Sequence, residues 1–164
     1  MFELRITDLK DAPTVGLGWA TKKVSLVDTS GVANPFFGEG HQVFVFDDLN
    51  SEKEECHRPG MRHAPKMKDI QNILHFTETF TDDDKVLIHC HGGISRSPAV
   101  AILVLIQHGA THQEAIDKVL EVRSVAWPNP LIIRLGDVAL GQNGALITFM
   151  NEWFNNNVGL ITWD

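Results

Sequence analysis

The fold is decided by residues 85–98, which have the sequence KVLIHCHGGISRSP. The stretch begins with Val86-Leu87-Ile88, a wholly apolar run of the kind found in strands that are buried on both faces. It ends at Pro98, where a segment that stays apolar almost all round as far as Ile106 predicts an interior helix. A cysteine, two glycines and an arginine lie between the two elements. We therefore predict a buried strand that enters a buried helix through a tight loop.

Outward from this stretch, the sequence indicates strands first and helices later. Strands are expected where short apolar runs are bounded by turn residues, at 2–6, 24–27 and 42–46. Helices are expected from Pro65, from about 98 to 106, after the capping box of Thr111 and Glu114, and at 131–140 and 145–154, with Gly109 as a stop. This order predicts an α/β fold in which helices flank a central, mostly parallel, twisted sheet of about four or five strands. We expect one domain over residues 1–164.

The loop at residues 90–96 has the composition of an anion-binding site. A loop between a strand and a helix N-terminus gathers backbone N–H groups in one concavity, and the helix adds partial positive charge there. Gly92 and Gly93 permit conformations and close approaches that a β-carbon resists. Arg96 carries a planar fork that matches two phosphate oxygens. We expect the substrate-binding groups to come from His91, Gly92, Gly93, Ile94, Ser95 and Arg96.

Cys90 lies in the same electrostatic field. A helix N-terminus, a cation and convergent N–H donors favour the thiolate over the thiol, and a thiolate beneath a bound phosphorus is a nucleophile for covalent catalysis. Ser97 is expected to donate a hydrogen bond to the sulfur and to ease its departure, and His89 to anchor the loop from behind. An isolated buried cysteine is by default a small core residue. Here its spacing from the glycines, the arginine and the serine favours a site.

This motif resembles the phosphate-binding loop of the protein tyrosine and dual-specificity phosphatase superfamily. The matching features are His89-Cys90, five further residues and then Arg96-Ser97, with Gly93 three positions after the cysteine. The resemblance extends over residues 42–149 and is closest to compact bacterial members. It implies a dual-specificity phosphatase-like fold and a cysteine-dependent enzyme that hydrolyses phosphomonoesters. It implies no metal and no organic cofactor, and it names phosphotyrosine, phosphoserine or phosphothreonine proteins as natural substrates.

The resemblance also implies an aspartate that protonates the leaving group. Asp47 and Asp48 both follow the strand at 42–46, and we favour Asp48 because relatives place the acid directly before an aliphatic residue, here Leu49. Asp69 is a weaker candidate because it lies on an expected helix, and residues 82–84 are expected to form a solvated turn. Asn129 resembles an asparagine that relatives hold beside the water of the second step, although a helix-capping role is equally consistent with its position.

Other interpretations of these residues stay open. A phosphate-binding module without turnover needs the same loop, and lipid, nucleotide or RNA-end phosphoesters are alternative substrates. Two other families share the spacing from cysteine to arginine. Low-molecular-weight phosphatases place the loop close to the amino terminus with a cysteine inside it, and neither holds here. Rhodanese-like proteins have different flanking residues and usually lack the Arg-Ser ending. A metal site is a further alternative, with His89 and His91 as ligands together with His63 and the pair Cys56-His57. No recognised zinc-ligand spacing is present, however.

Composition limits the partners of the chain. The net charge of −7 and the pI near 5.5 disfavour nucleic acid and anionic membranes as general partners. No apolar run is long enough to span a bilayer and no secretory signal is evident, so we expect a cytoplasmic protein. Cys56 is a candidate for a reversible disulfide with Cys90 under oxidation. It lies in a basic segment at residues 56–68, for which we expect a solvated loop or a pocket rim. The oligomeric state stays open.

Overall fold

The computed structural model describes residues 1–30, 38–53 and 63–157. At its centre is a four-stranded sheet in the order β1-β4-β2-β3, and all its neighbouring strands are parallel. The strands are β1 (Glu3–Thr7), β2 (Lys22–Val27), β3 (His41–Val45) and β4 (Lys85–His89). The predicted α/β fold with a central parallel sheet is confirmed.

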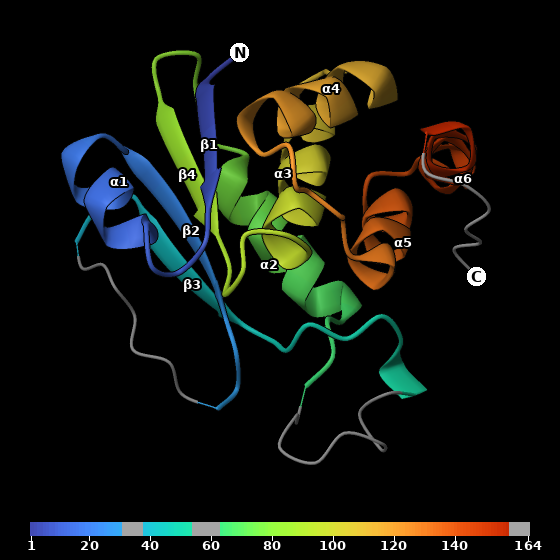
Figure 1. The fold of residues 1–164 in the computed structure, drawn as a ribbon, viewed down its shortest axis with the longest axis horizontal. Coiled ribbons are helices and arrows are strands. Elements are labelled where there is room, and N and C mark those ends of the chain that lie inside the picture. Colours follow the sequence, from blue (N-terminus) through green and yellow to red (C-terminus); the bar gives the residue numbers. More distant parts are fainter. Residues whose placement is uncertain (31–37, 54–62, 158–164) are drawn as a thin grey trace.

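Helices cover both faces of this sheet, with α1 on one side and the others on the opposite side (Figure 1). They are α1 (Ala12–Gly18), α2 (Met67–Thr77), α3 (Arg96–Gln107), α4 (His112–Val122), α5 (Pro130–Ala139) and α6 (Ala145–Asn157). The sequence did not predict α1, because seven residues with a proline and two glycines give little helical periodicity. The helix expected from Pro65 instead begins at Met67, after Lys66 in extended backbone.

The central strand and the central helix are both fully enclosed. Val86, Leu87 and Ile88 of β4 are buried; Leu87 packs on the α1 side, and its two neighbours pack into the main core. Every residue of α3 from Arg96 to Leu105 is buried, as the all-round apolar pattern predicted. The loop between these elements is therefore held firmly at both ends.

The predicted ends of α3 and α4 are confirmed. Gly109 follows α3 with φ +93°, a conformation that stops a helix and that glycine adopts without strain. Thr111 and Glu114 form the capping box of α4 through both of its reciprocal hydrogen bonds. In the part of the chain that the structure describes, no helix is long and apolar enough to cross a membrane.

Packing of α5 against α3 depends on Gly136. A β-carbon at this position would overlap the side chain of Leu103, which is itself buried. We expect Gly136→Ala to lower the free energy of unfolding by about 1–3 kcal/mol because of this overlap. Chemical denaturation measures the change. The control is Gly18→Ala at the end of α1, where no atom lies near the new methyl group. Equal effects of the two substitutions would contradict this account.

Candidate active site

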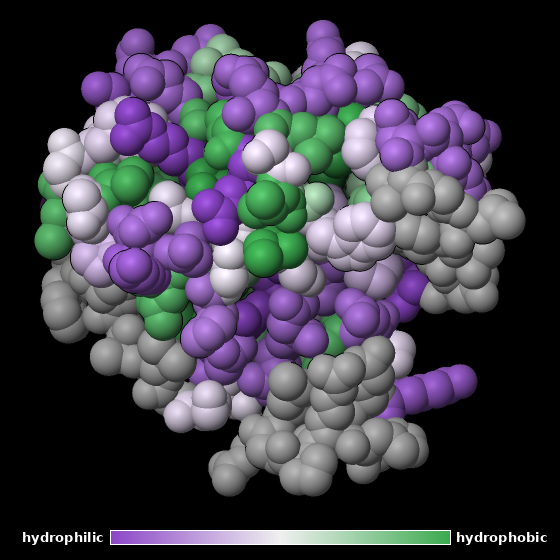
Figure 2. All heavy atoms as spheres, in the orientation of Figure 1, coloured by the Kyte–Doolittle hydropathy of each residue, from purple (hydrophilic) through white to green (hydrophobic). Residues whose placement is uncertain are grey.

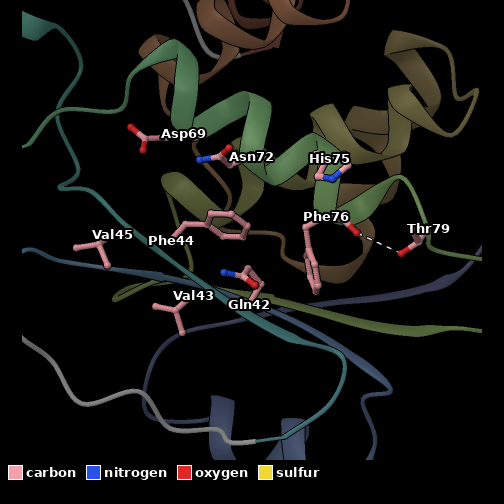
Figure 3. Close-up of a pocket in the computed structure, with 9 residues that line it drawn as sticks. All are labelled: Gln42, Val43, Phe44, Val45, Asp69, Asn72, His75, Phe76 and Thr79. Carbon is pink, nitrogen blue, oxygen red and sulfur yellow. Dashed lines mark hydrogen bonds between the residues drawn. The ribbon is translucent and has the colours of Figure 1, made fainter.

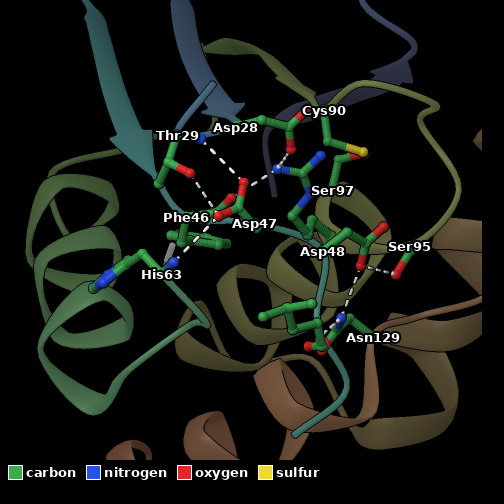
Figure 4. A network of polar contacts seen from close by, with 12 residues as sticks. Asp28, Thr29, Phe46, Asp47, Asp48, His63, Cys90, Ser95, Ser97 and Asn129 are labelled. Atoms are coloured by element: carbon green, nitrogen blue, oxygen red, sulfur yellow. Dashed lines mark hydrogen bonds and ion pairs between the residues drawn. The ribbon is translucent and has the colours of Figure 1, made fainter. Parts of the chain in front are cut away.

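The loop of residues 90–96, called the Cys90 loop below, leaves the C-terminal end of β4 and enters α3 (Figure 4). Gly93 has φ +65°, and a β-carbon there would lie 2.6–2.8 Å from the backbone of Thr7 and Asp8. The loop therefore needs glycine here for two reasons, its left-handed conformation and its contact with the end of β1.

Carbonyl groups of the Cys90 loop are turned outward. The carbonyls of His91, Ile94 and Ser95 accept hydrogen bonds from the backbone N–H groups of Leu9, Trp127 and Asn129, at 3.0, 2.7 and 3.0 Å respectively. The carbonyls of Gly92 and Gly93 accept from the guanidinium of Arg123. In so tight a loop, fixing the carbonyls outside directs the N–H groups toward the inside, and a row of such groups is a concave anion-binding surface.

Arg123 was missed by the sequence analysis. It follows α4 and donates from Nε to Gly93 and from Nη2 to Gly92, both at 3.0 Å. It is 27 positions from Arg96, and nothing in its own neighbourhood in the sequence indicates that it meets the loop. Only the packing of α4 against α3 brings it there.

The sulfur of Cys90 is buried and accepts two hydrogen bonds. Gly93 donates from its backbone N–H and Ser97 donates from its hydroxyl group, each at 3.2 Å from Sγ. Both donors stabilise negative charge on the sulfur. The structure thus places Ser97 beside the sulfur, where the sequence analysis expected it.

His89 lies behind the loop and is fully buried. Its Nε2 is 2.7 Å from the hydroxyl group of Ser25, which also lies 2.8 Å from Nε2 of His41. Burial, with smaller contributions from the nearby His41 and Arg96, lowers the pKa of His89 to about 4. The imidazole is therefore neutral at pH 7 and connects the end of β4 to β2 without adding charge under the loop.

Arg96 is 2% exposed, and one end of its guanidinium group is already held. Nη1 forms an ion pair with Asp28 at 2.7 Å and donates to the carbonyl of Phe46 at 2.7 Å. Nε has no hydrogen-bond partner among the described residues. A buried, unsatisfied N–H on a cation is costly, so this edge of the guanidinium is suited to bind an anion. Asp28 was also missed by the sequence analysis.

Asp48 reaches the same site from the segment after β3 (Figure 4). Its Oδ1 accepts hydrogen bonds from the hydroxyl of Ser95 at 2.6 Å and from the side-chain amide of Asn129 at 2.8 Å. Asn129 also caps α5, because its Oδ1 accepts from the N–H of Ile132. One asparagine thus performs the predicted capping role and holds the candidate acid.

The other aspartates considered from the sequence are engaged elsewhere. Asp47 is 2% exposed, and its carboxylate accepts from the backbone and hydroxyl of Thr29 and from the N–H of His63. Asp69 accepts from His63 and Lys66 at the start of α2. Residues 82–84 precede the N-terminal end of β4, whereas Cys90 follows its C-terminal end, and the strand between them is about 16 Å long.

A cavity of about 600 Å³ joins these groups. Its lining residues are Asp28, Ser30, Asp47, Asp48, Cys90, His91, Gly92, Ile94, Ser95 and Arg96. A second cavity, of about 660 Å³, lies between β3 and α2 and contains Asp69 together with Phe44 and Phe76 (Figure 3). Among the residues that the structure describes, none in the lining of this second cavity is a cysteine or an arginine. Cys56 and the basic segment from 56 to 62 lie outside the described residues, so the disulfide hypothesis stays a prediction.

Comparisons with known proteins agree with this architecture. No family model and no curated protein matches the sequence. Among solved structures, human DUSP28 is 19% identical with a TM-score of 0.53, covering 87% of this chain and 94% of that one. The Yvh1 phosphatase domain from Chaetomium thermophilum is 18% identical with a TM-score of 0.57, covering 89% and 95%. PTPMT1 in complex with PI(5)P is 15% identical with a TM-score of 0.56, covering 87% and 93%.

The chain therefore has the fold of the dual-specificity phosphatases. The resemblance noted from the Cys90 motif is confirmed at the level of the fold.

Removal of the Arg123 guanidinium should loosen the anion-binding surface. We expect Arg123→Ala to weaken binding of inorganic tungstate by about tenfold or more, because two hydrogen bonds to the loop carbonyls are lost. Isothermal titration calorimetry measures the affinity. Lys118→Ala removes an exposed cation from α4 that pairs with Glu121, and it should leave binding unchanged. A similar loss in both variants would mean that net charge, and not loop geometry, sets the affinity.

Proposed function

We propose that this protein is a cysteine-dependent phosphatase that hydrolyses phosphomonoesters through a thiophosphoryl-enzyme intermediate. Phosphotyrosine proteins, and phosphoserine or phosphothreonine proteins, are the proposed substrates. One observation carries the proposal: the hydrogen-bonded sulfur of Cys90 shares a cavity with a buried Arg96 whose Nε has no partner among the described residues. A nucleophile beside an unsatisfied cation is suited to attack at a bound phosphate.

In the first step, the thiolate of Cys90 attacks phosphorus, so that an S–P bond forms while the P–O ester bond breaks. Arg96 and the inward N–H groups of the Cys90 loop stabilise the charge on the non-bridging oxygens. Asp48 donates its proton to the leaving oxygen. The ion pair with Asp28 fixes the orientation of the guanidinium throughout.

In the second step, water attacks the phosphorus and the S–P bond breaks. Asp48, now ionised, accepts a proton from this water, and inorganic phosphate leaves. Ser97 donates its hydrogen bond to the departing sulfur and stabilises the thiolate. Asn129 and Ser95 keep the Asp48 carboxylate in place for both proton transfers. No metal or organic cofactor enters either step.

The chemistry of the loop does not by itself select the group that carries the phosphate. PTPMT1, which shares the fold, is known in complex with PI(5)P, so a lipid phosphate belongs among the substrates to be compared. Nucleotides and RNA ends are the remaining alternatives. Catalytic efficiencies for phosphopeptides, PI(5)P and nucleotides rank these classes.

Loss of the nucleophile tests the proposal directly. Cys90→Ser should abolish turnover of p-nitrophenyl phosphate in a steady-state assay, because a serine hydroxyl is not ionised in this site. Arg96→Lys should lower kcat/KM by at least about a hundredfold, since the ammonium group lacks the planar fork. Cys90→Ser should still bind tungstate, which shows that the loop is intact. Turnover that survives Cys90→Ser would contradict the proposal. Wild-type binding of tungstate without turnover would instead favour a phosphate-binding module.

The acid is tested through its dependence on the leaving group. Asp48→Asn should slow hydrolysis of phenyl phosphate by about a hundredfold or more, and that of p-nitrophenyl phosphate less, since the better leaving group needs less protonation. The matched control is Asp47→Asn, which should not show this leaving-group effect. It should lower the melting temperature, because the Asp47 carboxylate accepts hydrogen bonds from Thr29 and His63. If Asp47→Asn alone shows the leaving-group effect, the acid is misassigned.

A further inference from the structure

Three exposed apolar side chains, called the apolar rim below, lie beside the Cys90 loop. Ile94 is 43% exposed, Val125 57% and Trp127 41%. Ile94 belongs to the loop and lines its cavity, while the other two lie on the segment between α4 and α5. Figure 2 shows hydrophobic side chains gathered near the centre of this face, over the loop before α3 and the segment that leads to α5.

The apolar rim is continuous with the cavity. The backbone N–H of Trp127 donates to the carbonyl of Ile94 at 2.7 Å, so the two chain segments touch. The indole ring of Trp127 packs against Phe154 of α6, with ring centroids 4.9 Å apart at 61°. Trp127 is thus supported from behind and keeps a partly exposed surface. A rigid aromatic group that borders a polar cavity is a common anchor for a protein ligand.

The charge of the protein distinguishes between a membrane and a protein as the partner of the apolar rim. Among the described residues, the lining contains the carboxylates of Asp28, Asp47 and Asp48 and one Arg or Lys, Arg96, which is already paired with Asp28. The whole chain carries a net charge of −7. An anionic bilayer that lies against the outer surface meets repulsion from this net charge, whereas an uncharged apolar side chain meets none. These observations favour a protein substrate over a membrane.

We propose that the apolar rim binds an apolar residue that is adjacent to the phosphorylated residue of a protein substrate. This inference rests on the proposed phosphatase function and defines its substrate class. With the phosphate over Cys90, the side chain that carries it passes Ile94. The next residue of an extended peptide lies about 3.5 Å further along. It is within reach of Ile94 and of the chain segment that contacts Ile94 through the backbone of Trp127.

The test compares two phosphotyrosine peptides that differ only beside the phosphotyrosine, where one has leucine and the other has serine on both sides. Wild-type protein should show kcat/KM about tenfold higher for the leucine peptide, because partial burial of leucine favours its transition state. Val125→Asp and Trp127→Ala should reduce this ratio to near one. Turnover of p-nitrophenyl phosphate, which reaches no further than Ile94, should be unchanged in Val125→Asp.

Val138→Asp is the matched control, since Val138 is 66% exposed near the far end of α5, and it should keep the preference. Val125→Asp keeps the test decisive if Trp127→Ala fails to fold, because Val125 is the most exposed of the three. Equal rates on the two peptides, or a preference that survives Val125→Asp, would overturn the inference. So would faster hydrolysis of PI(5)P in vesicles that depends on Val125, since this outcome assigns the rim to a membrane. Loss of p-nitrophenyl phosphate turnover in wild-type protein would instead reject the phosphatase proposal itself.

Discussion

Between the end of β4 and the first turn of α3, the chain turns five successive carbonyl groups away from the cavity, from His91 to Ser95. Each of them is satisfied by a donor from elsewhere, so the orientation costs no buried unpaired carbonyl. In so tight a loop, we expect the N–H groups to face the space above Cys90, as that of Gly93 does. The proposed phosphate site depends on this orientation, because a concave row of N–H donors can bind an anion even in a protein of net negative charge.

This arrangement gives the peripheral helices a role at the centre of the site. The turn after β1 supplies one donor, Arg123 after α4 supplies two, and the segment before α5 supplies two more. The same α5 segment holds Asp48 through Asn129, so the candidate acid and the loop share one support. Asp28, which directly follows β2, holds one end of the Arg96 guanidinium, while Nε has no hydrogen-bond partner among the described residues.

The sequence alone predicted those features of the site that are formed by residues close together in the chain. The apolar run of β4, the all-round apolar α3 and the Cys90 motif each lie within a few residues, so periodicity and spacing were enough to place them. The capping box at Thr111 could be predicted from the sequence for the same reason. Asp28, Arg123 and the outer donors were not predicted, because they meet the loop only through tertiary packing. The choice between Asp47 and Asp48 also depends on side-chain direction: the first points to Thr29 and His63, and the second to Ser95.

The central claim is that the Cys90 loop and Arg96 together bind the oxygens of a phosphate above the cysteine sulfur. A crystal structure with orthovanadate tests it most directly. The account predicts vanadium within bonding distance of the Cys90 sulfur, with its oxygens in contact with the N–H groups of the loop and with Nε of Arg96. Vanadate held elsewhere, or bound here while the guanidinium and the loop N–H groups point away from it, would contradict the account.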